Sequence, residues 1–338
     1  MEPKNLLEKI LSHISLSEVE ASYLMHQIME GQLVPTVVAA FLVALRAKGE
    51  SAGEIAAFAK VMREKATPVL AQGGQIIDTC GTGGDGSGSY NISTTAALLL
   101  AGGGYKVAKH GNRSMTSRSG SADLLEALGI RIDLGPEQVA ACIDHCGFGF
   151  LFAPSLHSSM KNVGPIRKEL QVRTVFNLLG PLTNPARANV QIIGLYDANR
   201  VLQMAEVLRL MGTQTAYVVA GLDGLDEVSI QADTRVARLK DGEIAEFDFD
   251  PENFGYPKAS LEEIRGGGPD ENAQITLGLL SGNIQGPKKD ILALNAGFAI
   301  SAADGVGLKE GFHKAEELIA SQRGKVAIEM LRTYTHSL

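Results

Sequence analysis

Residues 1 to about 65 carry apolar side chains at helical spacing. Ser17 with Glu20, and later Ser51 with Glu54, form capping-box pairs ahead of apolar stretches, and Pro35 stands where a proline favours a helix start. We predict only helices in this region. Their faces are too apolar for one layer standing alone, so we expect them to pack on another part of the chain or on a second subunit.

After Pro68, short apolar runs alternate with helical stretches. The strand candidates are 75–78, 105–108, 190–195, 215–219 and 228–230. The helical stretches include 94–100 and 200–211, and 266–269 is typical of a loop before a helix that begins near Asn272. This alternation predicts an α/β domain with a mainly parallel sheet.

The pattern therefore predicts two unequal parts. Residues 1–70 are expected to form a small all-helical domain, and helices around 160–185 are candidates to join it. Residues 71–338 are expected to form the larger α/β domain.

Composition narrows the class of protein. The chain has 338 residues and a net charge of −7, which argues against broad binding to nucleic acid or to anionic membranes. Three cysteines, Cys80, Cys142 and Cys146, are too few and too odd in number for a disulfide framework. The chain shows no signal-peptide pattern and no apolar run of membrane-spanning length. We expect a soluble, cytoplasmic protein.

Glycine is in excess, with 38 residues, and it gathers in one informative segment. The stretch 78–94 passes from a predicted strand through Gly81, Gly83, Gly84 and Gly86 to a predicted helix start. Backbone N–H groups converge in such a turn and the helix dipole favours anions, so the pattern predicts a phosphate site. Polar side chains at the helix start add donors, and the Ser93 hydroxyl can also bind a metal ion.

Two familiar phosphate motifs fit this loop poorly. A dinucleotide-binding loop needs an acidic residue about twenty positions further on. The chain instead has Lys106, Lys109 and His110 there. A Walker A loop fails because no Gly-Lys-Ser/Thr follows.

A basic stretch follows the glycine loop. Lys106, Lys109, His110, Arg113 and Arg118 occur without an acidic residue between positions 85 and 123, interleaved with glycine and hydroxyl residues. A basic run is usually a solvated surface, but beside a phosphate loop we interpret this one as wrapping a multiply charged ligand.

Two further features indicate chemistry. Asp226 and Glu227 follow an apolar strand candidate, where they can hold one or two magnesium ions together with phosphate oxygens, although a solvated acidic turn is the alternative. The Arg167 guanidinium suits a carboxylate ligand, although a surface ion pair is the commoner role. For His157, structural and functional roles are both open.

Several motifs, in order along the chain, look like those of the anthranilate phosphoribosyltransferase family. These motifs are residues 81–85, 91–94, 109–113, 122–129, 173–182, 224–227 and 294–297. The resemblance runs through nearly the whole chain. It implies a homodimer with a small helical domain and a phosphoribosyl diphosphate-binding α/β domain. It also implies transfer of phosphoribose from phosphoribosyl diphosphate to the amino group of anthranilate, with release of diphosphate, in tryptophan biosynthesis.

The resemblance also implies site residues and a magnesium cofactor (Mg²⁺). The residues implied to bind phosphoribosyl diphosphate are Gly81, Gly84, Asp85, Ser89, Asn91, Ile92, Ser93, Thr94, Lys109, His110, Gly111, Asn112, Arg113, Ser114, Met115, Thr116, Ser117 and Ser121. Those implied to contact anthranilate are Gly81, Asn112 and Arg167, and those implied to serve magnesium are Ser93, Asp226 and Glu227. No catalytic acid, base or nucleophile is expected, because electrostatic stabilisation and positioning suffice.

Two departures and two rivals remain open. Ser158 and Gln171 stand where the family usually has proline and glycine, near the anthranilate entrance that the resemblance implies, so these two positions bear on anthranilate affinity. The nearest rival is a pyrimidine nucleoside phosphorylase-like enzyme, and a catalytically silent regulatory or nucleic-acid-binding relative is a third possibility. The acidic pair Asp226–Glu227 favours the transferase over both.

Overall fold

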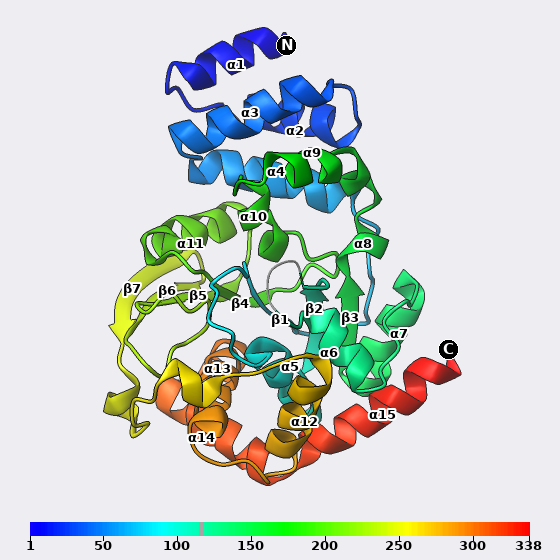
Figure 1. Ribbon diagram of the computed structural model, residues 1–338, viewed down its shortest axis with the longest axis vertical. Coiled ribbons are helices and arrows are strands. Elements are labelled where there is room, and N and C mark those ends of the chain that lie inside the picture. Colours follow the sequence, from blue (N-terminus) through cyan, green and yellow to red (C-terminus); the bar gives the residue numbers. More distant parts are fainter. Residues whose placement is uncertain (115–117) are drawn as a thin grey trace.

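A computed structural model describes residues 1–114 and 118–338 of the chain. Its first four helices lie together at one end of the molecule (Figure 1). They are α1 (Pro3–Leu11), α2 (Glu18–Met29), α3 (Pro35–Lys48) and α4 (Ala52–Lys65). The prediction of a helical N-terminal region is confirmed, although the apolar pattern had not singled out α1.

The predicted helix signals are present in the geometry. The Ser17 and Ser51 side chains accept from the backbone N–H groups of Glu20 and Glu54, so both capping boxes are formed. Pro35 occupies the first turn of α3. These local bonds satisfy helix N–H groups that would otherwise lack partners.

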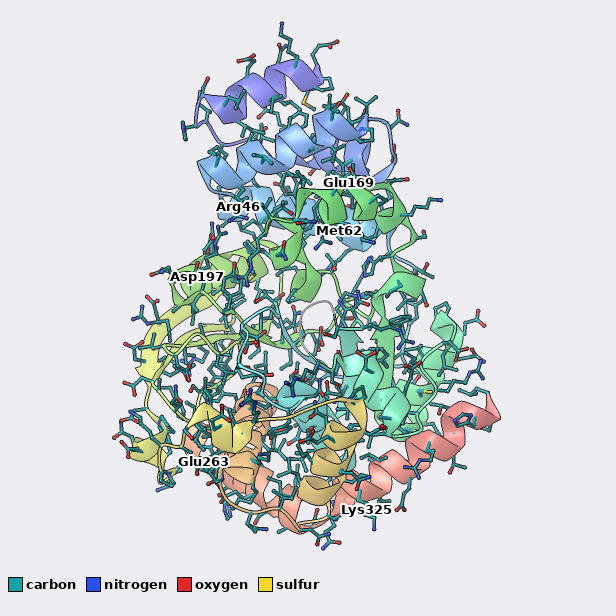
Figure 2. All side chains as sticks on the ribbon, viewed as in Figure 1. Arg46, Met62, Glu169, Asp197, Glu263 and Lys325 are labelled. Atoms are coloured by element: carbon teal, nitrogen blue, oxygen red, sulfur yellow. The ribbon has the colours of Figure 1, made fainter. Side chains whose placement is uncertain are left out.

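Short helices lie in the middle of the chain, and several of them pack on this helical bundle. They are α8 (Ala153–Leu156), η1 (Ser158–Asn162), α9 (Gly164–Leu170), α10 (Phe176–Leu179) and η2 (Gly180–Leu182). Helix α9 contacts α3, and α10 contacts α4. Val163 and Phe176 share one apolar cluster with Phe41 and Phe58 of the bundle. Figure 2 labels Arg46 of α3, Met62 of α4 and Glu169 of α9, which lie in the helical part of the molecule.

A seven-stranded sheet forms the centre of the larger part, in the order β3-β2-β1-β4-β5-β6-β7. The strands are β1 (Ile76–Gly81), β2 (Lys106–Gly111), β3 (Phe148–Phe152), β4 (Val190–Gly194), β5 (Thr215–Gly221), β6 (Thr234–Lys240) and β7 (Glu243–Phe249). The first five in this order run parallel, and β6 and β7 are antiparallel. The predicted mainly parallel α/β sheet is confirmed.

Helices cover both faces of the sheet, as the alternation within β5 requires. Tyr217 and Val219 join an apolar cluster with the C-terminal helices, whereas Ala216 and Val218 join the cluster that contains the N-terminal bundle.

The remaining helices are α5 (Ile92–Gly102), α6 (Ser121–Ala127), α7 (Pro136–Cys146), η3 (Ala198–Arg200), α11 (Val201–Leu210), η4 (Pro251–Phe254), η5 (Leu261–Ile264), α12 (Pro269–Leu280), α13 (Pro287–Asp304), α14 (Leu308–Ala320) and α15 (Arg323–Ser337).

Some boundaries differ from the predictions. Residues 228–230 form a buried loop rather than a strand, because the Val228 N–H and C=O bond to the Asn295 side chain instead of to a neighbouring strand. Helix α12 starts at Pro269, before the expected position near Asn272. Strands β3, β6 and β7 were not predicted.

In the described part of the chain, no single helix is both long and apolar enough to cross a membrane. The bent pair α13–α14, with 117° between its helices, meets the criteria for a membrane span by length and composition only.

Candidate functional site

The carboxyl ends of β1, β4 and β5 meet at one edge of the sheet. Gly81 ends β1 and pairs in register with Gly194, which ends β4. The glycine loop leaves β1 here and leads into α5, and the loop that carries Asp226 leaves β5 beside it. Ligand sites of open α/β sheets lie at this edge.

Asp226 packs directly against both strand ends. A Cβ atom added to Gly81 would lie 2.2 Å from Asp226 Oδ2, and one added to Gly194 would lie 1.6 Å from the Asp226 carbonyl oxygen. Only glycine leaves room for this approach. The backbone N–H of Gly83 donates to Asp226 Oδ2 over 2.7 Å, so the acidic residue reaches the glycine loop itself.

Glu227 reaches the start of α5. Its Oε1 atom accepts from the Ser93 backbone N–H at 3.1 Å, and Lys109 Nζ lies 3.3 Å from Ser93 Oγ. Lys109 is buried and also donates to the Thr79 carbonyl oxygen. The structure therefore brings together Ser93, Asp226 and Glu227, the three residues implied to serve magnesium.

The carboxyl groups of Asp226 and Glu227 are buried close to other negative charges, which raises the pKa of each. Burial raises the pKa of Asp226 to about 7, with repulsion from the Asp85 carboxylate as the next cause. Burial and repulsion from Asp226 raise the pKa of Glu227 to about 8, against the attraction of Lys109. Buried like charges of this kind are relieved by a cation or by protonation.

The donor set fits magnesium. Asp226, Glu227 and the Ser93 hydroxyl supply only oxygen atoms, the ligands that Mg²⁺ prefers. Within residues 1–114 and 118–338, no group of three His, Cys, Asp or Glu side chains is arranged to enclose a metal ion. The arrangement suits an ion that keeps water and takes phosphate oxygens from a substrate.

The glycine loop is hydrogen-bonded to residues 264–266, a segment for which the sequence analysis gave no role. Gly266 N–H donates to the Gly88 carbonyl oxygen at 2.9 Å, Tyr90 N–H donates to the Ile264 carbonyl oxygen, and Ser89 forms a β-bridge with Arg265. Gly83 and Gly84 adopt φ of +68° and +77°, which side chains disfavour. The loop has a fixed shape with backbone N–H groups along it.

The implied residues of the loop and of α5 differ in exposure. Asn91 precedes α5, donates to the Ser119 carbonyl oxygen and accepts from Asn272 Nδ2 at 2.8 Å. Asp85 accepts from Ser87 N–H at 3.4 Å. Ile92 and Thr94 are buried, so a ligand in this site meets their backbone rather than their side chains.

The basic stretch divides, which corrects the interpretation that all of it wraps one ligand. Lys106 begins β2, at the opposite edge of the sheet, and pairs with Asp144 at 2.6 Å. Arg113 is bound by the Glu126 and Asp123 carboxylates, which raise the pKa of its guanidinium above its usual range. Only Lys109 reaches the acidic pair through Ser93.

The segment after β2 is held by one carboxylate. Asp123 Oδ2 accepts from the backbone N–H groups of Ser114 and Gly120, at 3.0 and 2.8 Å. A Cβ atom on Gly111 would lie 2.6 Å from Ser121 Oγ, so these two implied residues touch, and Asn112 is exposed. The implied residues Met115, Thr116 and Ser117 lie outside the described residues.

Two histidines form a buried pair that the sequence did not predict. His110 Nε2 lies 3.1 Å from His157 Nε2, and His110 Nδ1 lies 3.0 Å from the Gly180 carbonyl oxygen. Burial lowers the pKa of His110 to about 3 and that of His157 to about 4. Both imidazoles are therefore neutral at pH 7, and one Nε2 donates to the other.

Arg167 lies on α9, on the helical side of the site. Its guanidinium stands 5.4 Å from the centre of the Phe176 ring, and burial lowers its pKa. No carboxylate in the described ranges forms an ion pair with it. A half-buried arginine in this state suits a carboxylate ligand.

Three supporting residues lie in segments that the sequence analysis named, but it assigned them no role of their own. Arg173 donates to the Gly84 carbonyl oxygen at 2.5 Å and stacks on Tyr196, while its own carbonyl oxygen accepts from Arg46 of the bundle. Asn295 fixes the loop of the acidic pair through Val228. Asp78 is buried below the site, where Asn184 donates to it at 2.7 Å.

This combination of helical bundle, parallel sheet and anion loop defines a class of transferase. Residues 4–66 match the family described as "Glycosyl transferase family, helical bundle domain", and residues 73–325 match "Glycosyl transferase family, a/b domain".

More specific relatives share the whole chain. The anthranilate phosphoribosyltransferase of Symbiobacterium thermophilum is 50% identical over 336 residues, which cover 99% of this chain and 98% of the relative. The chain belongs to the anthranilate phosphoribosyltransferase family.

Solved structures agree with this membership. The enzyme of Thermus thermophilus superimposes with a TM-score of 0.93 at 44% identity, covering 98% of this chain and 99% of that one. The Saccharomyces cerevisiae enzyme in complex with PRPP and Mg gives a TM-score of 0.90 at 32% identity, covering 99% and 98%.

Proposed function

We propose that this chain transfers the phosphoribosyl group of phosphoribosyl diphosphate to the amino group of anthranilate, giving N-(5-phosphoribosyl)anthranilate and diphosphate, with Mg²⁺, in tryptophan biosynthesis. The observation that carries the proposal is the contact of Asp226 and Glu227 with the backbone donors of the glycine loop and of α5. Membership of the anthranilate phosphoribosyltransferase family gives the two substrates.

The glycine loop and α5 bind the charged substrate in this account. The residues that surround the diphosphate and ribose phosphate in this proposal are Gly81, Gly84, Asp85, Ser89, Asn91, Ser93, Thr94, the 109–114 segment and Ser121. Backbone N–H groups at a helix start stabilise negative charge, and that charge grows on the diphosphate as its bond to ribose breaks. Lys109 adds a buried positive charge beside Ser93.

Asp226, Glu227 and Ser93 would hold magnesium through carboxylate and hydroxyl oxygens. A bound Mg²⁺ supplies charge that neutralises diphosphate oxygens. Asn295 keeps the loop of Asp226 and Glu227 in place by bonding to both polar backbone atoms of Val228.

Anthranilate binds on the helical side, with Gly81, Asn112 and Arg167 as its contacts in this proposal. The Arg167 guanidinium pairs with the substrate carboxylate and so directs the amino group toward the ribose, which is catalysis by positioning. The aromatic amine is neutral at pH 7 and attacks directly, so no general base is needed. The neutral His110–His157 pair fits a site that does not remove a proton by an imidazolium cycle.

The reaction is tested by the loss of anthranilate fluorescence. The expected result is a loss that requires both phosphoribosyl diphosphate and Mg²⁺ and that yields equimolar diphosphate. A flat signal together with phosphate-dependent cleavage of thymidine would assign the chain to the nucleoside phosphorylases instead.

We also propose that the chain is a homodimer in the cytoplasm, with domains divided near residue 70. The proposed dimer is supported by large apolar side chains exposed on the helical bundle, among them Val34 at 60% and Val43 at 45%. Three buried free thiols support a reducing compartment. Light scattering of the purified protein tests the dimer, since a monomer mass at micromolar concentration contradicts it.

A further inference from the structure

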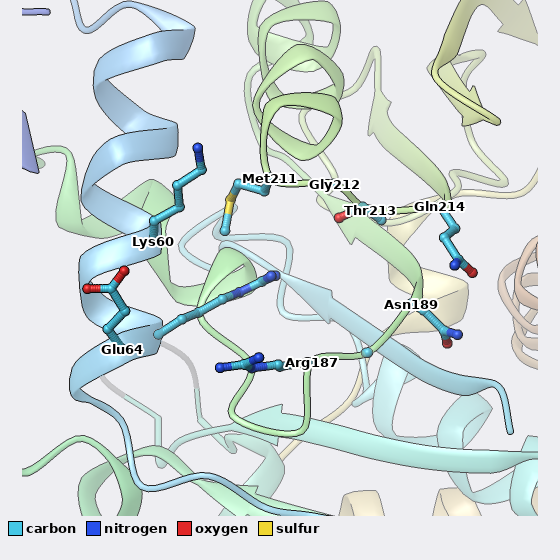
Figure 3. A pocket seen from close by; sticks show the side chains of 10 residues that line it. Lys60, Glu64, Arg187, Asn189, Met211, Gly212, Thr213 and Gln214 are labelled. Atoms are coloured by element: carbon cyan, nitrogen blue, oxygen red, sulfur yellow. The ribbon is translucent and has the colours of Figure 1, made fainter. Parts of the chain in front are cut away.

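A cavity of about 340 Å³ lies outside the site described above. It is open to solvent and bordered by the C-terminal half of α4, the segment that leads into β4, and the turn between α11 and β5 (Figure 3). Because β4 and β5 begin here, the cavity faces the amino ends of strands whose carboxyl ends form the glycine-loop site. The two sites are on opposite edges of the sheet.

The charged residues that line the cavity are mainly basic. Lys60, Arg63 and Arg187 line it, against the single acidic residue Glu64. Lys60 Nζ is paired with Glu18 at 2.7 Å, and the Glu64 carboxylate lies 3.7 Å from His26. Across the described part of the chain, no carboxylate lies within ion-pair distance of Arg63 or Arg187, and the buried Asp78 attracts Arg63 only from a longer distance.

One nitrogen of the Arg63 guanidinium lacks a hydrogen-bond acceptor among the described residues. Its Nε atom donates to the Leu182 carbonyl oxygen at 2.6 Å, but its buried NH2 group has no hydrogen-bond partner among the described residues. Burial and repulsion from Arg187 lower the pKa of Arg63 to about 10, against the attraction of the buried Asp78. A buried donor without an acceptor costs free energy, which an anion at this position would recover.

Arg187 also lines the cavity, and its backbone has a left-handed conformation. Its φ is +53°, in the left-handed region that non-glycine residues seldom adopt, and its N–H donates to the Asn184 carbonyl oxygen at 3.1 Å. Figure 3 shows its side chain extending toward α4. Strained backbone of this kind often marks a functional position, and here it directs a second guanidinium beside the first.

We propose that this cavity binds a small tetrahedral oxyanion of the phosphate class, held by the guanidinium groups of Arg63 and Arg187 with Lys60 at the rim. Two planar guanidinium groups match the oxygens of such an anion by paired, charge-assisted hydrogen bonds. The volume admits free phosphate or the phosphate group of a small ester. The bound anion joins α4 of the helical bundle to the sheet.

The test compares thermal stabilisation of the full-length chain by inorganic phosphate with that by sodium chloride at equal ionic strength. Arg187→Gly removes one guanidinium and tolerates the positive φ, and Arg209→Gln, on an exposed arginine of α11 paired with Glu206, is the matched control. The glycine loop also attracts phosphate, but its contribution is the same in all three proteins.

Phosphate is expected to bind the cavity of Arg187→Gly at least about tenfold more weakly than that of the wild type, with Arg209→Gln unchanged. Glycerol 3-phosphate as a second probe distinguishes a free anion from an ester. Equal phosphate stabilisation of wild type and Arg187→Gly overturns the proposal.

A second measurement tests the proposal on the wild type alone, in case Arg187→Gly does not fold. Wild-type crystals soaked in selenate are expected to give an anomalous peak between the Arg63 and Arg187 guanidinium groups. A peak at the glycine loop alone also overturns the proposal.

Discussion

Asp226 and Gly83, 143 positions apart in the chain, are joined by a hydrogen bond of 2.7 Å from the Gly83 N–H to Asp226 Oδ2. The acidic loop after β5 is thereby fitted to the glycine loop after β1, and glycines at both strand ends make the approach possible. The anion-binding loop and the candidate metal ligands are consequently one structural unit.

Gly194→Ala is expected to disturb this unit. The new methyl group would lie 1.6 Å from the Asp226 carbonyl oxygen, and backbone on both sides leaves little room to relax. We expect the free energy of unfolding, measured by urea denaturation, to fall by about 1–3 kcal/mol. Gly180→Ala is the matched control, since nothing lies within 4 Å of its added Cβ. Equal losses in the two variants would contradict the close packing at Gly194.

The acidic pair predicts a pH dependence of stability in the absence of divalent cations. The folded-state pKa values of about 7 for Asp226 and about 8 for Glu227 lie above those of carboxyls in the unfolded chain, near 4. The folded protein therefore holds more protons. This contribution to stability is complete below pH ~4 and is lost progressively as pH rises from there through the folded-state pKa values of about 7 and about 8.

Urea unfolding in EDTA between pH 5 and 8 measures this effect. Relative to the variant Asp226→Asn with Glu227→Gln, the wild type is expected to lose up to about 1.4 kcal/mol per pH unit for each carboxyl. Parallel pH profiles for the two proteins would show that the pair ionises normally.

Much of the fold was predictable because its signals are local. The capping boxes at Ser17 and Ser51 and the glycine-rich exit from β1 act through neighbouring residues. The β6–β7 hairpin was missed although an Asp241-Gly242 turn separates its strands, because β6 buries the adjacent residues Val236 and Ala237 on its two faces and so lacks a clean apolar–polar alternation.

The site was predictable in composition but not in geometry. The motifs named Asp226, Glu227 and Ser93, yet their contacts depend on the register of β1 with β4, which no local pattern gives. The same holds for the contact of Arg173 with Gly84. Asn295 offered one signal, a polar residue within the apolar run of α13.

Arg167→Ala is expected mainly to raise the KM for anthranilate. The lost charge-assisted contact is worth about 1.5–3 kcal/mol, which corresponds to a KM increase of about 10- to 150-fold with a smaller change in kcat. Lys168→Ala, on the exposed neighbour in α9, is the control. Steady-state kinetics decide the point, and an unchanged KM removes Arg167 from the anthranilate site.

The His110–His157 pair is expected to remain uncharged through the physiological range. With pKa values lowered to about 3 and about 4, neither imidazole titrates between pH 5 and 8. Histidine NMR chemical shifts followed over that range measure this. A midpoint near 6.5 for either member would mean that the pair is open to solvent.

The dependence of anthranilate consumption on Mg²⁺ tests the proposed transfer most directly. Initial rates with phosphoribosyl diphosphate are compared for the wild type, for Asp226→Ala with Glu227→Ala, and for the control Asp233→Ala, whose carboxylate pairs with Lys258 at the surface. The account predicts a saturable Mg²⁺ response in the wild type and control and its loss in the double variant. A normal Mg²⁺ response in the double variant, or a wild type that leaves anthranilate untouched, would contradict it.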